Sequence, residues 1–147
     1  MRLVLLVALA AVHHGQAPAP CSSTAAKQAL RSSGIGLAQP PDRLICFDLT
    51  RDGRIDMAVT LFSGGTAGDV RLVVFRGTAS GWRVALVRGG YKLGLERVDG
   101  DLVQTQPVYR KDDPNCCPTG GFDHMRWHWN GDRFVAVRTW RDRRFRP

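Results

Sequence analysis

The stretch DLTRDGRID, residues 48–56, holds the side chains that most directly suggest a chemistry. Calcium takes about six to eight oxygen ligands, and a loop that offers oxygens at alternate positions around a glycine bend can surround it. The bend here is Gly53, and the oxygens come from three carboxylates, a hydroxyl and a backbone carbonyl: Asp48, Thr50, Asp52, Arg54 (through its carbonyl) and Asp56. The spacing predicts a structural calcium site that stabilises the fold.

The same residues also suit a tight turn without an ion, in which Asp48 and Asp52 accept hydrogen bonds from nearby backbone amides. Arg51 and Arg54 bring positive charge to the loop, which weakens its attraction for a cation. Three carboxylates so close along the chain repel one another unless they are neutralised, and this favours calcium over the empty turn. Both interpretations give the loop a structural role.

The segment CFDLTRDGRIDMAV resembles the calcium loop of FG-GAP/VCBS-type repeats, where a strand enters an aspartate-rich loop and an apolar strand leaves it. The resemblance covers residues 45–75 and implies the same five calcium ligands. Those repeats occur several to a chain and close a propeller, but this chain has one copy, which implies a single blade-like hairpin. The chain also resembles small exported proteins of high-GC actinobacteria, in which DPNCCP and WNG elements recur.

A candidate ligand surface lies near the C-terminus, where basic and aromatic residues gather. Residues 123–129, DHMRWHW, have the composition of a strand, so His124 and His128 lie about 13 Å apart, too far to share one metal ion. Aromatic and basic side chains hold sugars, wall polymers or nucleic-acid strands by stacking and charge. The predicted surface comprises His124, Arg126, His128 and Trp140.

Core packing is the alternative use of the tryptophans in this region. Strand alternation places Met125, Trp127 and Trp129 on one face, opposite the histidines. A small β domain needs large apolar side chains inside, and such a row supplies them.

Catalysis has weaker support in the sequence. Cleavage of RNA needs a base, an acid and a cation around one phosphate, which Glu96, His124 and Arg126 would supply if folding brought them together. No G-x-S-x-G element is present, and the cysteines suit disulfides better than nucleophiles. We therefore expect a non-catalytic module, with a small basic secreted hydrolase, such as a ribonuclease, as the alternative.

Four cysteines, Cys21, Cys46, Cys116 and Cys117, predict two disulfides. Three pairings are open. A bond between the adjacent Cys116 and Cys117 would close a very small ring, so we expect each of them to join Cys21 or Cys46. Zinc is less favoured because the cysteines do not form C-x-x-C pairs.

The formal net charge is +8, and 18 of the 21 basic residues are arginine. This excess suits an anionic partner, although a compositional bias toward arginine would produce it too. We expect the partner to be an anionic cell-wall polymer or another exported protein rather than a nucleic acid, and we expect no membrane span.

The N-terminus predicts export. Arg2 is followed by an apolar run, residues 3–12, and then by small residues, which is typical of a secretory signal and too short to span a bilayer. We expect residues 1–19 to be removed and residues 20–147 to form one domain outside the cell. No later apolar run has the length of a membrane helix.

The elements that must position these residues follow from the hydrophobic pattern. Ser23 or Thr24 is expected to cap a short helix over residues 25–30, which Gly34 ends. From residue 44 onward the apolar period is two, and turn sequences such as DGD and NGD separate about eight short segments. Trp82, Val84 and Leu86 should share one face of their strand. The fold class is therefore mostly β (α+β), an antiparallel, disulfide-stapled domain with one N-terminal helix. No internal repeat is evident.

Overall fold

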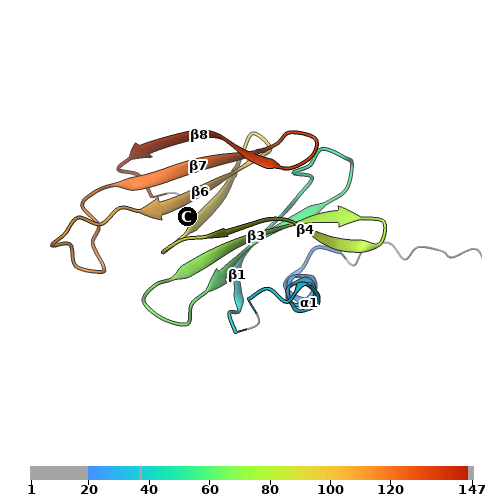
Figure 1. The fold of residues 1–147 in the computed structure, drawn as a ribbon, viewed down its shortest axis with the longest axis horizontal. Coiled ribbons are helices and arrows are strands. Elements are labelled where there is room, and N and C mark those ends of the chain that lie inside the picture. Colours follow the sequence, from blue (N-terminus) through green and yellow to red (C-terminus); the bar gives the residue numbers. More distant parts are fainter. Residues whose placement is uncertain (1–19, 37, 146–147) are drawn as a thin grey trace, which may run out of the picture.

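The protein consists of one helix and two four-stranded sheets, seen in a computed structural model that describes residues 20–36 and 38–145 (Figure 1). The elements are α1 (Ser23–Ser33), β1 (Pro41–Phe47), β2 (Asp56–Phe62), β3 (Asp69–Thr78), β4 (Gly81–Gly89), β5 (Gly94–Val98), β6 (Asp101–Pro107), β7 (Phe122–Trp129) and β8 (Phe134–Asp142). The expected mostly β, antiparallel fold with one short helix is confirmed. The predicted signal segment, residues 1–19, lies outside the described residues.

Both sheets are antiparallel meanders with consecutive strands as neighbours. The first has the order β1-β2-β3-β4 and the second β5-β6-β7-β8. Short connections explain this topology, because neighbouring antiparallel strands can be joined by tight turns whereas parallel strands need long crossovers. No described helix has the length and apolar character needed to cross a membrane.

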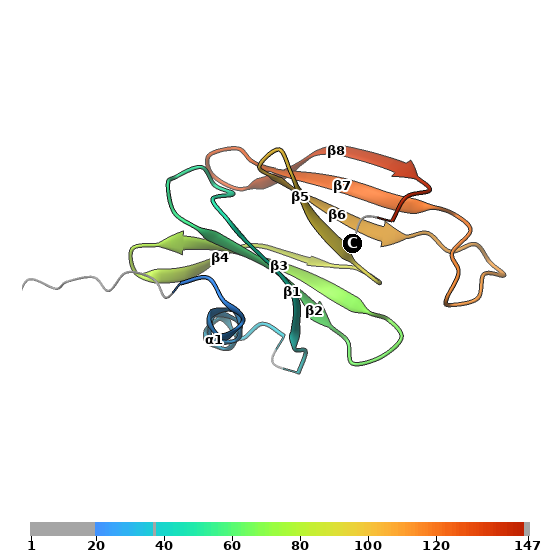
Figure 2. The ribbon, with the colours of Figure 1, turned by 180° about the vertical axis from the view of Figure 1, so that it is seen from behind.

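Helix α1 packs on one face of the first sheet, as Figure 2 shows from behind. Its N-cap is Ser22 instead of the expected Ser23 or Thr24, and the Ser22 side chain accepts a hydrogen bond from the Ala25 amide at 3.1 Å. Gly34 ends the helix with φ 68°, a conformation that glycine adopts at little cost. The apolar side of the helix, Ala26, Ala29 and Leu30, lies against Met57, Val59, Leu61, Val73 and Phe75.

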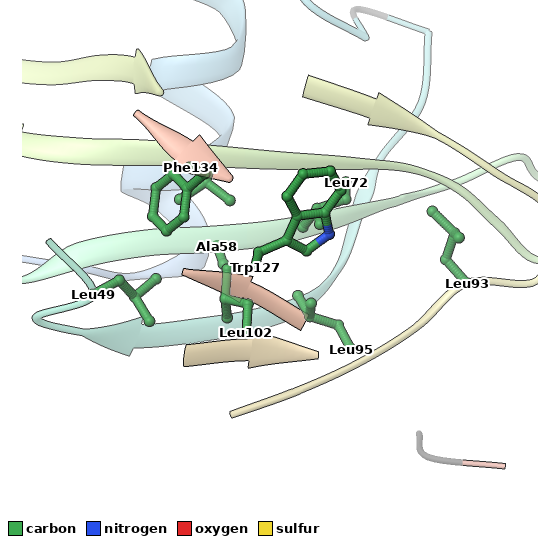
Figure 3. Packing of buried hydrophobic residues seen from close by; sticks show 9 residues of the cluster. Leu49, Ala58, Leu72, Leu93, Leu95, Leu102, Trp127 and Phe134 are labelled. Carbon is green, nitrogen blue, oxygen red and sulfur yellow. The ribbon is translucent and has the colours of Figure 1, made fainter. Parts of the chain in front are cut away.

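The opposite face of the first sheet packs against the second sheet, so the first sheet is covered on both sides. Alternate residues of β2 and β3, Ala58, Leu72 and Val74, point into this second core. Trp127 and Phe134 fill it from the second sheet, together with Leu95 and Leu102 (Figure 3). This double burial explains why nearly all of β2 is inaccessible to water.

A β-bulge in the β3–β4 pair corrects one expectation about side-chain faces. The register shifts so that Val74 pairs with Leu86 and Phe75 pairs with Val84. Trp82 consequently packs in the helix-side core and Leu86 in the core between the sheets, instead of sharing one face. An inserted residue moves every later side chain to the other face, and the hydrophobic pattern alone does not reveal it.

The disulfides differ from the expected pairing. Cys21 bonds to Cys46, which joins the residue before the helix cap to β1, and Cys116 bonds to Cys117 within the β6–β7 loop. The expected crossed pairing is wrong because that loop extends away from the helix in both views (Figures 1 and 2). The Cα atoms of Cys21 and Cys46 lie 5.9 Å apart, an ordinary distance for a bridge.

Candidate functional site

The aspartate loop connects β1 to β2 and is organised by its own carboxylates. Asp48 accepts hydrogen bonds from the backbone amides of Asp52 at 3.0 Å and Gly53 at 2.9 Å. Gly53 has φ 82°, which favours glycine at the bend. Asp48 therefore fixes the turn in the way expected for an aspartate at the start of a loop.

Asp52 faces a cation from β3. One oxygen accepts from the Arg54 amide at 3.0 Å, and the other accepts from Nη2 and Nε of Arg76 at 2.8 and 3.2 Å. Burial raises the pKa of Asp52, but the hydrogen bonds from Arg76 and Arg54 outweigh it and hold the pKa below its usual value. Arg76 thus supplies part of the neutralising charge that the sequence assigned to calcium.

Asp56 is completely buried at the start of β2. Its two oxygens accept from the backbone amides of Thr50 at 2.7 Å and Gly77 at 2.9 Å, which links the loop to the end of β3. Burial raises the pKa of Asp56 against the opposing effect of these two amides. The Thr50 hydroxyl is buried beside this carboxylate and also opposes the rise in its pKa.

The five predicted calcium ligands therefore share one loop, and each carboxylate oxygen already accepts a hydrogen bond there. Within residues 20–36 and 38–145, no three acidic, histidine or cysteine side chains come together in a way that would hold a metal ion. The Thr50 hydroxyl is buried next to Asp56. Calcium binding stays a prediction.

Arg51 connects the aspartate loop to the second sheet. Its guanidinium lies 3.5 Å from Asp101, the first residue of β6. Asp101 also accepts from Arg126 Nε at 2.7 Å and from His128 Nδ1 at 2.8 Å. Arg126 and His128, both predicted as ligand-surface residues, are thus engaged with a buried carboxylate.

A cleft opens on the face of the second sheet that also carries core residues. Strand alternation places Gln104 and Gln106 on the same face as Leu102, and Asp123 and Met125 on the same face as Trp127. Two rows across β6, β7 and β8 form the floor: Gln104, Met125 and Thr139, then Gln106, Asp123 and Arg141. The cleft encloses about 570 Å³.

Two of the four predicted surface residues, His124 and Trp140, also line this cleft, whereas Arg126 and His128 do not. Its charged pair, Asp123 and Arg141, is joined by hydrogen bonds of 2.6 and 3.0 Å, so the floor carries little net charge. The glutamines were missed because polar residues in strands usually face water. Their shared face with Leu102 in the pattern LVQTQP is the signal that could have identified them.

His124 is buried in a polar chain across three strands. Nδ1 lies 2.9 Å from the Thr105 hydroxyl, Nε2 lies 3.0 Å from Asp142, and Trp140 stacks on the ring. A hydroxyl, an imidazole and a carboxylate in sequence resemble a hydrolytic triad. Thr105 is fully buried, however, so this hydroxyl does not meet a substrate in the present conformation.

The acid–base set considered for RNA cleavage is only partly assembled. Glu96 pairs with Val103, and Val103 pairs with Arg126, so Glu96 and Arg126 lie on the same face of the sheet. Their backbones are two strand spacings, or about 10 Å, apart. His124 lies on the same face but is 2% exposed. Arg126 is directed to Asp101.

Comparisons with protein-family models, curated proteins and solved structures find no match to this chain.

Proposed function

We propose that this protein is an exported, non-catalytic binding module that holds its ligand in the cleft of the second sheet. The observation that carries the proposal is a row of polar side chains at core-facing positions of the second sheet. These side chains line a cavity of about 570 Å³ that a ligand could enter. Cavities of this size suit a small molecule or a short stretch of polymer. Two disulfides and the apolar N-terminal run support an address outside the cell.

The ligand we propose is a segment of cell-wall polysaccharide. The amide of Gln106 and the hydroxyl of Thr139 each offer both donors and acceptors, which matches the hydroxyl groups of sugars. Gln104 is mostly buried, and its carbonyl accepts a hydrogen bond from Trp127 Nε1 at 3.2 Å. Met125 adds an apolar patch to the same floor. The net charge of +8 would draw an anionic wall polymer to the protein, although the cleft floor itself is nearly neutral.

Burial of the reactive groups supports a module without catalysis. A general base or nucleophile must reach the atoms on which it acts. His124 and Thr105 are inaccessible, and the guanidinium of Arg126 is held by Asp101. The ribonuclease alternative would need these contacts to break.

Calcium remains a proposal for the aspartate loop, in a structural role. Asp48, Asp52, Asp56, the Thr50 hydroxyl and the Arg54 carbonyl would hold the ion. The spacing of these oxygens along the loop supports this, and the Arg76 contact to Asp52 opposes it, because the arginine already neutralises that carboxylate. The FG-GAP/VCBS-like character of the hairpin is likewise proposed from the sequence alone.

The binding proposal is tested by titrating the protein with a soluble fragment of cell-wall polysaccharide and following its amide resonances by NMR. The resonances of β6, β7 and β8 at the cleft should shift. Gln106→Leu and Thr139→Val should each weaken binding several-fold, because each loses hydrogen bonds to the ligand. Gln28→Leu, a matched change on the exposed side of α1, should leave the affinity unchanged.

Shifts that fall elsewhere, or equal affinities for the cleft variants and Gln28→Leu, would reject the cleft. Release of shortened fragments during the titration would reject the non-catalytic assignment.

A further inference from the structure

The second disulfide lies in an exposed loop that other residues hold in place. Cys116 and Cys117 are both exposed, and the Cys117 amide donates to the Pro114 carbonyl at 2.9 Å. The carbonyl of Asn115, just before the pair, accepts from the Tyr109 hydroxyl at 2.7 Å and also from Lys92 Nζ. The pair is therefore presented to solvent on an ordered turn.

Asp113 stabilises the same loop by joining residues before and after the cysteine pair. Its carboxylate accepts from the backbone amides of Arg110 and Thr119, both at 2.7 Å, and from the Thr119 hydroxyl at 2.8 Å. These contacts occupy both oxygens of the Asp113 carboxylate. The hydrogen bond from the Thr119 amide lowers the pKa of Asp113, as does the positive charge of Arg110, but the Arg110 guanidinium forms no direct ion pair in the described part of the chain.

A cavity of about 480 Å³ adjoins the loop and has a cationic lining. It is formed by Arg110, Pro118, Thr119, Gly121, Phe122 and Arg143. No carboxylate is among these residues, and Arg143, like Arg110, forms no ion pair with a described residue. Two guanidinium groups at one cavity are suited to an anion such as a carboxylate group. The Asp113 carboxylate, which Thr119 binds, partly offsets the charge of Arg110.

The cavity and the disulfide are close because of their spacing in the chain. Thr119 follows Cys117 by two residues, and two residues span at most about 7 Å of backbone. Neither cysteine lines the cavity, but the lining begins at Pro118, the residue directly after Cys117. A small thiol held by its anionic group in the cavity would have this disulfide as its neighbour in the chain.

From these contacts we propose that Cys116–Cys117 is a redox-active site that exchanges with a low-molecular-weight thiol bearing a carboxylate. This activity is separate from binding in the cleft. The ligand thiolate attacks one cysteine sulfur, the bond between the two cysteines breaks, and the other sulfur leaves as a thiolate. A second ligand thiolate then attacks the mixed disulfide. Two ligand thiols are oxidised to one ligand disulfide, and the cysteine pair is reduced to two thiols.

The test compares 3-mercaptopropionate with cysteamine, which carry opposite charges, at equal thiolate concentration and low salt. Alkylation of freed cysteines and peptide mass spectrometry follow Cys116–Cys117 and Cys21–Cys46 in the same sample. For each disulfide we compare the rate of reduction by 3-mercaptopropionate with the rate by cysteamine. This ratio should be about fivefold higher at Cys116–Cys117 than at Cys21–Cys46, because charge attraction concentrates the anionic thiol there, and added salt should reduce the ratio.

The double variant Arg110→Met with Arg143→Met should abolish this preference. The control, Arg83→Met with Arg133→Met, removes the same charge from exposed positions elsewhere and should retain it. Equal ratios at the two disulfides, or a preference that survives in the first double variant, would overturn the proposal. Free thiols at Cys116 and Cys117 in the untreated protein would overturn it too.

Discussion

Asp56 and Asp101 occupy equivalent positions in the two sheets. Each is the first residue of the second strand of its meander, each is buried, and each carboxylate bonds to groups at the third strand. An Asp-Gly pair precedes both, with φ 82° at Gly53 and φ 83° at Gly100. The sequence showed no repeat because the first loop is longer, but the sheets repeat one plan: a buried aspartate that anchors the strand beside it.

Removal of the Asp56 carboxylate should strongly destabilise the protein. Asp56→Ala leaves the Thr50 and Gly77 amides buried without acceptors, and we expect a loss of about 3 kcal/mol in the free energy of unfolding. Asp48→Ala should cost only about 1 kcal/mol, since water can reach its partners. Urea unfolding checks both values, and equal losses would contradict the role of burial.

Asp101 should contribute to unfolding in acid. Burial raises its pKa, but the hydrogen bonds from His128 and Arg126 outweigh that effect and lower the pKa below the usual value of 3.8. The native carboxylate then binds fewer protons than the unfolded one, so its stabilisation is present above about pH 4 and is lost as the pH falls through the native pKa. The free energy of unfolding, measured with urea at pH 5 and at pH 3, should change less between these two pH values for Asp101→Asn than for the wild type. An unchanged difference would contradict this assignment.

A β-branched residue in the β5–β6 turn should destabilise the protein. Asp99 has φ 51° and is followed by Gly100, the left-handed pair that a two-residue hairpin requires. Asp99→Val should reduce the free energy of unfolding by about 1–2 kcal/mol, because a β-branched side chain is strained in this region. Asp99→Asn, which tolerates that backbone, serves as the control in thermal melts. Equal melting temperatures for the two variants would refute the turn.

The two disulfides should differ in their effect on stability. Cys21–Cys46 spans 25 residues, and the paired change to serine should cost about 3 kcal/mol through the entropy of the unfolded chain. Cys116–Cys117 joins neighbours, and its paired replacement should cost about 1 kcal/mol or less. Denaturant unfolding of both double variants measures the difference, and the reverse order would be inconsistent with these pairings.

Calcium should stabilise the protein if the aspartate loop binds it. For a dissociation constant of about 1 mM, 10 mM calcium adds about 1.4 kcal/mol, or a few degrees in the melting temperature. Asp52→Asn should weaken this shift, and 10 mM magnesium controls for ionic strength. A melting temperature that is the same with calcium and with a chelator would remove the ion from this loop.

Much of the fold could be predicted because apolar alternation reports which face of a strand is buried. The period of two places Ile55, Met57, Val59 and Leu61 on one face, and the last three are buried together, whereas Ile55 lies before the strand and is exposed. Met125, Trp127 and Trp129 pack toward the core between the sheets. The pattern could not reveal the bulge that separates Trp82 from Leu86, because an extra residue in one strand depends on the partner strand.

The candidate sites were harder to predict because they depend on contacts between distant segments. Local spacing marked the loop of Asp48 and Asp56 but not Arg76, which lies 24 residues beyond Asp52. The sequence predicted His124 at a surface, but in the structure it is buried and hydrogen-bonded to Thr105 and Asp142. The pairing of four cysteines likewise depends on where the helix and the β6–β7 loop lie.

The Cys21–Cys46 bond has a consequence for limited proteolysis of the protein. It joins the start of α1 to β1, across the segment that connects the two elements. A cut anywhere in residues 34–40 would leave the helix covalently attached to the sheet that it covers. The nicked protein should keep its helix-side core closed until a reductant frees the fragment.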